Sequence, residues 1–442
     1  MNFMGKLPIL STYTVLVAYI VLVPFYYFSE AIFHPVLVVV AKYLPLLFIA
    51  ILASKYIRGN AYSSRVRIGF IIILPYFFFS LLSLLDATHQ DLGLYKWFYY
   101  SISGMGVFLL SHGLLNERFS IIKLAKRISC ITSISAAYGI WVYFSEIDVI
   151  WGINSSFPPL FHSDFGGWET DRPVATLGNT LYAAGVFSLI LPLAYASFLD
   201  SKSKFRFVYG LSCVILLLGV IVTYSRGALI TVMISSTVYI FSFRRQINWS
   251  KISYSLLGTA LIIGIVIAVL PSTVRTFSAI TDRVFDRFSA LYDPNIFTTA
   301  GNEPYRIAQY ETVYGILKED PALGIGFGNY VVEFDRIKSA SLQYIHAQAK
   351  TTENMYLMIV AETGILGLVS FVAIVIYVIF CLQKKRNNMG IESNWETAFI
   401  ASIAGGLFNM ATWDALNQPT MRILFWLILA FGMVLTKTDT GE

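Results

Sequence analysis

The sequence predicts an all-α polytopic membrane protein with about 12 transmembrane helices, because three features of the chain agree. Hydrophobic residues make up 56% of the 442 residues and charged residues only 13%, whereas a soluble domain carries roughly a quarter charged residues. Apolar runs of about 20 residues, the length that crosses a bilayer, recur along the chain. Lysine and arginine gather in every second junction between these runs. Together these features exclude a soluble globular protein.

Twelve apolar runs define the expected helices. The first run should be retained, because it is longer than the core of a signal peptide and lacks a small-x-small cleavage site. The break at 223–226 is very short, and the run at 395–413 carries polar residues. The expected spans are residues 7–28, 35–57, 68–85, 93–115, 129–145, 178–199, 207–223, 226–243, 253–271, 355–382, 395–413 and 420–436.

The basic residues predict which junctions face the cytoplasm. Short cytoplasmic loops of membrane proteins carry an excess of lysine and arginine. The basic clusters of this chain lie at residues 55–67, 118–127, 202–206, 244–251 and 384–386. Both termini are therefore expected in the cytoplasm, and twelve spans satisfy the alternation. The net charge of +6 follows from this placement, so it does not indicate a nucleic-acid partner.

The same runs divide the chain into three parts. Residues 1–270 hold the first nine helices, residues 271–354 form a large extracytoplasmic loop, and residues 355–442 hold the last three helices. Within the loop, residues 281–292 and 305–321 place apolar side chains on one face and charged ones opposite, which predicts two amphipathic helices. The three cysteines lie scattered inside apolar runs and predict neither a metal site nor a disulfide framework.

Three arginines lie on or near the expected outer face. Arg172 precedes the sixth expected span, Arg226 begins the eighth, and Arg306 lies early in the second loop helix. An arginine at the edge of the hydrocarbon is costly unless it is paired or faces a water-filled cavity. The alternatives are a side chain that reaches the interface, or a salt bridge. At Arg226, a helix N-terminus adds backbone N–H groups suited to phosphate.

Glu353 and Asn354 lie where the large loop meets the tenth expected span. A carboxylate at this position could act as a general base, or it could simply occupy the first turn of a helix beside a capping residue. His346 lies near the same junction and could assist, or could be an exposed histidine without a role. The string Gly324-x-Gly326-x-Gly328 follows no strand and lacks a GK[ST] sequence, so it predicts a tight turn rather than a phosphate loop.

Several segments carry a resemblance to a known family. They are TYSRGALI (223–230), YRIAQYETVYGILKEDPALGIGFGNY (305–330), ENMYLMIVAETGILGLVSF (353–371) and the earlier RPVATLGNTLYAAGVFSLILPLA (172–194). In this order they resemble the O-antigen ligase and polymerase family of bacterial polysaccharide assembly. The resemblance covers roughly the second half of the chain.

This resemblance implies a GT-C-like helical glycosyltransferase in the bacterial cytoplasmic membrane, with its site in the large outer loop. The donor would be an oligosaccharide on undecaprenyl diphosphate, and the partners would be a glycan acceptor, membrane lipid and a chain-length regulator. No metal and no cofactor would be needed. Guanidinium groups can stabilise a diphosphate leaving group without a cation, because their planar fork matches phosphate oxygens.

The resemblance also suggests roles for the candidate residues. Glu353 would accept the proton of the acceptor hydroxyl, and Arg306 would be the second catalytic residue. The residues expected to bind the diphosphate or the glycan are Arg172, Arg226, Asn354 and His346.

One position departs from the ligase branch of the family. The motif of that branch looks like a His followed by Asn, Ser or Gln, then nine residues and then Gly-x-x-Gly. Asn354, Gly364 and Gly367 fit this spacing, but Glu353 stands at the histidine position and His346 is out of register. The departure favours an inverting polysaccharide polymerase over an O-antigen ligase, and the ligase remains the alternative.

A transporter is the rival from another class. A major-facilitator carrier normally shows two related halves joined by a long cytoplasmic link, whereas the longest loop here is expected outside, after the ninth span. A flippase for lipid-linked glycans is the closer rival. It is expected to place charged residues within several helix interiors, which are largely uncharged here apart from Lys42.

Overall fold

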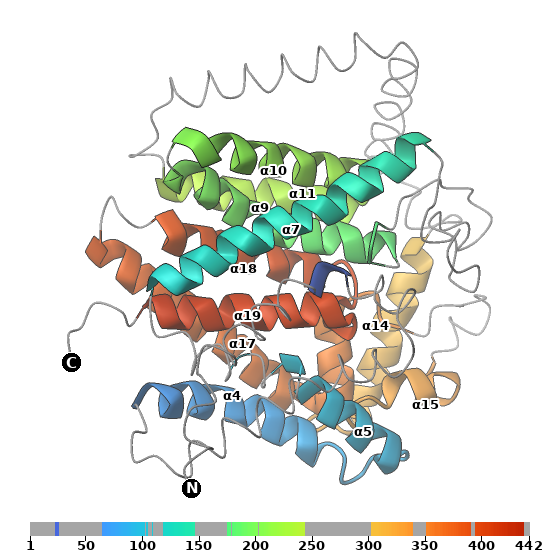
Figure 1. Cartoon of the computed structure of the whole chain (residues 1–442). Helices are drawn as coiled ribbons and strands as arrows, with labels where there is room; N and C mark the ends of the chain where they lie inside the picture. The colour runs from blue at the N-terminus through green and yellow to red at the C-terminus, as the bar shows by residue number, and fades with distance from the viewer. Residues whose placement is uncertain are drawn as a thin grey trace, which may run out of the picture.

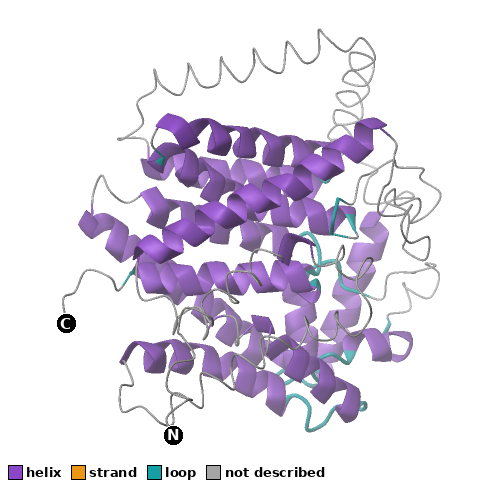
Figure 2. Cartoon of the chain, viewed as in Figure 1, coloured by secondary structure: helices purple, strands orange, loops and turns teal. Residues whose placement is uncertain are grey.

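The computed structural model describes part of the chain, and the described residues form helices and turns with no strand among them (Figure 2). They are residues 23–25, 64–101, 103–104, 108, 118–145, 175–177, 179–201, 203–243, 302–338, 351–389 and 394–436. The expected spans 35–57 and 253–271 and the expected amphipathic helix 281–292 lie outside them, as does most of the expected span 7–28.

The long helices coincide with expected spans to within a few residues at most of their ends. They are α4 (Ser64–Leu82), α5 (Gln90–Ser101), α7 (Arg118–Ser145), α9 (Thr180–Asp200), α10 (Ser203–Val222), α11 (Arg226–Phe243), α17 (Met355–Met389), α18 (Asn394–Met410) and α19 (Pro419–Leu435).

Within the described residues, three segments are long and apolar enough to cross a membrane: Thr180–Asp200, Phe205–Val222 and Met355–Asn388. Shorter apolar helices cover 71–82, 226–241 and 419–435. These helices support a helical membrane protein. The number of twelve spans stays a prediction.

One clear difference from the expected spans lies at the start of α7, which begins at Arg118, well before the expected run. Ile121 and Leu124 are buried in this extension, and Lys126 Nζ pairs with Asp200 Oδ2 of α9 at 2.6 Å. Hydropathy alone places the start of this helix after the basic residues at 118–127, because they interrupt the apolar run. The helix continues because its apolar face still packs on the bundle.

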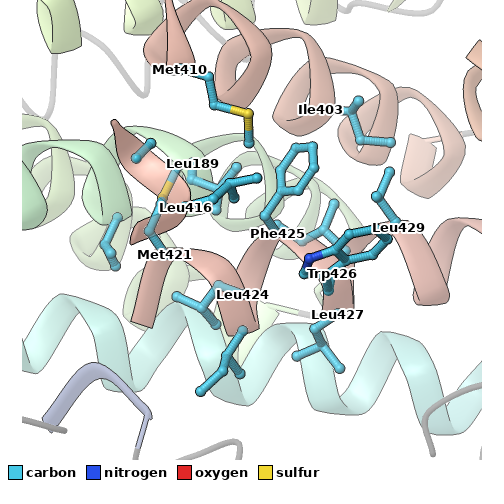
Figure 3. Close-up of a cluster of buried hydrophobic side chains, with 14 of the residues drawn as sticks. Leu189, Ile403, Met410, Leu416, Met421, Leu424, Phe425, Trp426, Leu427 and Leu429 are labelled. Carbon is cyan, nitrogen blue, oxygen red and sulfur yellow. The ribbon is translucent and has the colours of Figure 1, made fainter. Parts of the chain in front are cut away.

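The helices α9 and α19 lie in the middle of the stack (Figure 1). The helix α9 contacts α7, α10, α11, α18 and α19, and α19 is buried over nearly its whole length. The close-up shows Phe425 and Trp426 of α19 beside Leu189 of α9 and Ile403 and Met410 of α18 (Figure 3). This shared apolar core fixes the relative positions of the helices that carry the site.

Contacts sort the junctions of the bundle into two ends. At one end Asn394 Nδ2 donates to the carbonyl oxygen of Ala196 at 3.1 Å, near the Lys126–Asp200 pair. At the other end Tyr182 stacks on Trp413, with ring centroids 5.1 Å apart. The junctions at this second end are those for which the sequence predicts the outer side.

Two helices of the expected large loop lie at this second end (Figure 1). The helix α14 (Asn302–Glu319) runs across the bundle axis, and α15 (Tyr330–Ile337) lies next to it. The helix α14 coincides with the second expected loop helix, and within it Val313 and Ile316 are buried while Tyr310 and Tyr314 are exposed. Two 3₁₀ turns, η1 (Val23–Phe25) and η5 (Ala415–Asn417), complete the described elements.

Candidate active site

The structure places four of the predicted site residues at the second end of the bundle, for which the sequence predicts the outer side. Arg226 is the first residue of α11 and is half-buried. Glu353 and Asn354 directly precede α17. Arg306 lies early in α14, and its side chain is outside the described part. Two further predicted residues, Arg172 and His346, lie outside the described residues.

Asn354 caps the N-terminus of α17. Its Oδ1 accepts hydrogen bonds from the amide nitrogens of Tyr356 at 2.9 Å and Leu357 at 3.3 Å. Its carbonyl oxygen accepts the hydroxyl of Thr352 at 2.6 Å. This is the arrangement by which Asn satisfies the first free N–H groups of a helix. Among the described residues, Asn354 Nδ2 has no hydrogen-bond partner.

Glu353 has a backbone conformation that is unusual for its residue type. Its φ is 45°, and the other described non-glycine residues with positive φ are Ala175 at 52° and Tyr224 at 51°. The three lie at Glu353 itself, two residues before Arg226, and three residues after Arg172. Non-glycine residues in such conformations cost about 1–3 kcal/mol and cluster at functional sites.

A hydrogen bond ties α14 to the segment that carries Glu353. Gln309 Nε2 donates to the carbonyl oxygen of Thr351 at 2.5 Å. Arg306 precedes Gln309 by three residues, which is about one helical turn. The two predicted catalytic residues therefore lie on neighbouring segments.

A second contact places Arg226 beside the junction between α18 and α19. A Cβ on Gly227 would lie 2.6 Å from the hydroxyl of Thr412, so α11 and this junction are in close contact. Trp413 is fixed by its own hydrogen bond, from Nε1 to Asn409 Oδ1 at 2.6 Å.

Residues 321–329 (PALGIGFGN) form a turn, as the sequence predicts, and this segment is called the glycine-rich turn below. Gly324, Gly326 and Gly328 have φ values of 67°, 96° and 75°. The turn fits into a kink of α17 at Gly364. In a continuous helix the Ile365 amide would donate to the carbonyl of Ala361.

The turn replaces the helical bond that the kink breaks. The Ile365 amide donates to Pro321 O at 3.0 Å, and Ala361 O accepts the Ile325 amide at 3.0 Å. Both backbone groups exposed by the kink are therefore satisfied by one segment, residues 321–325.

The other side of this turn rests on the connection between α4 and α5. The Phe327 amide donates to Ser83 Oγ at 3.0 Å, and Lys96 Nζ donates to Gly328 O at 2.6 Å. The amide of His89 donates to Asn329 Oδ1 at 3.1 Å. The glycine-rich turn thus joins α17 to α4 and α5.

Phe327 of this turn lines a cavity of about 20 Å³. Its lining includes two buried ionisable side chains, Glu362 of α17 and Arg422 of α19. Glu362 Oε1 accepts the Tyr330 amide at 3.3 Å. Met355 and Ile359 also line the cavity, so Glu362 continues the stripe of α17 that begins beside Asn354.

Neither Glu362 nor Arg422 was predicted from the sequence. Glu362, Glu396 and Arg422 all fall inside expected spans and are buried, so the helix interiors are not largely uncharged. A charged residue within an apolar run was the available signal, since such residues are rare in membrane helices unless they have a function. In the described part of the chain, no three His, Cys, Asp or Glu side chains form a group that could hold a metal.

One comparison bears on this geometry. Residues 211–372 match the family model described as O-antigen ligase. Over this range, which is less than half of the chain, the protein is similar to the O-antigen ligase domain. No curated protein matches the chain.

The O-antigen ligase domain confirms the family resemblance and covers most of the candidate residues. Arg226, Arg306, His346, Glu353 and Asn354 lie within residues 211–372. The domain also contains Glu362 and the glycine-rich turn. Arg172 lies before its start and Arg422 after its end. Glycan transfer of the O-antigen ligase and polymerase type is therefore the general activity that this domain supports.

Proposed function

We propose that the protein is a polysaccharide polymerase that transfers glycan units from undecaprenyl diphosphate onto a glycan acceptor. The reaction takes place at the outer face of the bacterial cytoplasmic membrane, in a GT-C-like bundle with both termini in the cytoplasm. One observation carries the proposal: the O-antigen ligase domain contains Arg226, Arg306 and Glu353. Their helix starts lie at the same end of the bundle.

The proposed chemistry is a single displacement that inverts the anomeric carbon. The acceptor hydroxyl oxygen forms a bond to this carbon as the bond from carbon to the diphosphate oxygen breaks. Glu353 takes the hydroxyl proton, and undecaprenyl diphosphate leaves with the bonding electron pair. Donors fixed in place for a developing charge typically contribute about 3–4 kcal/mol each, which is the role of Arg306.

The remaining predicted residues bind substrate in this proposal. Arg226 offers a guanidinium together with the first N–H groups of α11, which suits a phosphate oxygen. Asn354 can donate from Nδ2 while its Oδ1 caps α17. Arg172 and His346 are assigned to the diphosphate or the glycan on the sequence resemblance. The site needs no metal or cofactor in this scheme.

Two alternatives are kept because they predict different products. An O-antigen ligase would transfer finished polymer to a surface acceptor, and Glu353 at the position of the ligase histidine argues against it. A flippase would move the lipid-linked unit without forming a glycosidic bond. The buried Glu362 and Arg422 are compatible with this second alternative, so it requires a direct test.

The test is deletion of the gene in its host, followed by sizing of the surface glycan and of the lipid-linked pool. We expect single repeat units on an otherwise normal acceptor, because flipping and ligation survive when polymerisation is lost. A bare acceptor with long polymer on the carrier lipid would instead establish a ligase. Single units trapped on the carrier, with nothing on the acceptor, would establish a flippase.

A complementation series then tests the residues. Arg306→Ala should abolish long polymer, and unchanged output from this variant would remove its role at the leaving group. Membrane abundance of each variant is measured in parallel, so that loss of protein is distinguished from loss of transfer. Partners such as a chain-length regulator are read from the length distribution rather than from total output.

A further inference from the structure

Arg422 is a buried cation whose hydrogen bonds are incomplete. Its side chain is 1% exposed. Nε donates to Ser103 Oγ at 2.7 Å, and Nη1 donates to the carbonyl oxygens of Leu416 at 2.8 Å and Asn417 at 3.3 Å. The guanidinium also lies over the ring of Tyr100, 3.7 Å from its centroid. Among the described residues, Nη2 has no hydrogen-bond partner.

An acidic side chain lines the same cavity. Glu362 lines it together with Arg422, and within the described part of the chain no ion pair joins the two. The cavity volume of about 20 Å³ is enough for about one water molecule, which needs two to four polar partners. Arg422 Nη2 and the Glu362 carboxylate supply a donor and an acceptor.

We propose that this cavity is a binding site for one ordered water that bridges Arg422 Nη2 and the Glu362 carboxylate. The bridged pair positions the two turns on either side of the cavity. A buried arginine and a buried glutamate can stabilise each other, because removing one partner leaves the charge of the other less compensated in an apolar interior. Lys96 of α5 is a second cation that acts on Glu362.

Each member of the pair holds a different turn. Arg422 binds the carbonyl oxygens of Leu416 and Asn417 and so fixes the junction that contacts the start of α11. Glu362 binds the Tyr330 amide and so fixes the end of the glycine-rich turn. The water bridge therefore links the junction between α18 and α19, which lies beside Arg226, to the glycine-rich turn, which packs against α17. Neither charged residue needs to touch substrate for this effect.

The first test is a double-mutant cycle on the thermal unfolding of the full chain in nanodiscs. The variants are Glu362→Gln, Arg422→Gln and the double variant. We expect the melting temperature of the double variant to fall by less than the sum of the falls in the two single variants, with a difference of about 2 °C or more. Additive losses would overturn the pairing. Should Arg422→Gln fail to accumulate, recovery of folded protein in the double variant supports the pair, and no recovery overturns it.

A matched control uses another buried acid. Glu396 is 0% exposed and lies in the first turn of α18, at the far end of the bundle. Glu396→Gln should combine additively with Arg422→Gln, because distant sites without shared partners act independently. A density map that resolves ordered water should show one peak between Nη2 and the carboxylate. A dry cavity would overturn the bridge.

The positioning role of the Glu362–Arg422 pair rests on the proposed function and is measured separately, by the kinetics of glycan transfer. In a transfer assay well below the melting temperature, Glu362→Gln should lower kcat by about tenfold or more. The KM for the lipid-linked donor should change little, because the pair touches no substrate. A normal kcat would remove the positioning role. If the wild-type protein shows no transfer, the proposed function fails, whereas the melting cycle still tests the pair.

Discussion

Gly364 of α17 lies so close to Ala322 of the glycine-rich turn that a Cβ on Gly364 would be 2.0 Å from the Ala322 carbonyl oxygen. The backbone of Gly364 has φ 63° and ψ −170°, a region that only glycine populates to any extent. Close approach and backbone conformation therefore both require glycine here. The contact determines how the glycine-rich turn sits on α17.

The first prediction is that Gly364→Ala destabilises the protein by more than about 2 kcal/mol, because conformational strain adds to the clash. The kink would have to straighten, and the turn would lose its bonds to Ile365 and Ala361. Thermal unfolding in nanodiscs measures the loss, and proteolysis of the outer loop reports whether the turn has come away.

Gly315 supplies the control. A Cβ at this position in α14 would meet nothing within 4 Å. Gly315→Ala should therefore leave the protein unchanged or stabilise it by up to about 1 kcal/mol, since alanine favours helix more than glycine does. Equal melting temperatures for the two variants would contradict the assigned kink.

The second prediction concerns the strained backbone of Glu353. Asparagine tolerates positive φ better than glutamate does, so Glu353→Asn should raise the melting temperature by about 2 °C, equivalent to about 1 kcal/mol. Transfer should be lost, because the proposed base is gone. Glu353→Gln keeps the strain and should lose transfer without gaining stability. Wild-type turnover in Glu353→Gln would remove the assignment of Glu353 as base.

The third prediction separates the two roles of Asn354. Aspartate keeps the capping oxygen and suits the positive end of a helix, so Asn354→Asp should melt like the wild type. Its transfer should fall, because the Nδ2 donor is replaced by a negative charge beside the diphosphate. Asn354→Ala should also melt lower, by about 1 kcal/mol of lost capping. An Asn354→Asp variant with full transfer would mean that this residue only caps α17.

Local sequence features predicted much of this architecture. The start of α11 at Arg226 follows from one apolar run that meets another across the short break at 223–226, and the structure has this boundary. The glycine-rich turn was recognisable because no strand precedes it. The helix α14 was recognisable from the apolar face around Val313, which is buried. Each of these features depends on residues that are neighbours in the sequence.

The site itself depends on residues that are far apart in the sequence, which explains what the sequence did not predict. The GILG stretch of α17 reads as an ordinary helix, and the kink at Gly364 forms only because the turn at 321–325 takes over its hydrogen bonds. Glu362 and Arg422 share a cavity only after α17 and α19 have packed together. A charge in each apolar run was visible, but its partner was not.

The last prediction is a pH dependence at Asp414, in the junction between α18 and α19. Burial raises the pKa of the Asp414 carboxyl above its ordinary value of 3.8, and a hydrogen bond from Asn417 at 2.9 Å opposes the shift. The folded protein therefore binds more protons than the unfolded chain as pH rises above about 4, so stability falls through this window. Asp414→Asn cannot ionise. Its melting temperature relative to the wild type should therefore increase from pH 4 towards neutral pH and then level off. A difference that does not change with pH would show that the Asp414 carboxyl does not titrate above its ordinary range.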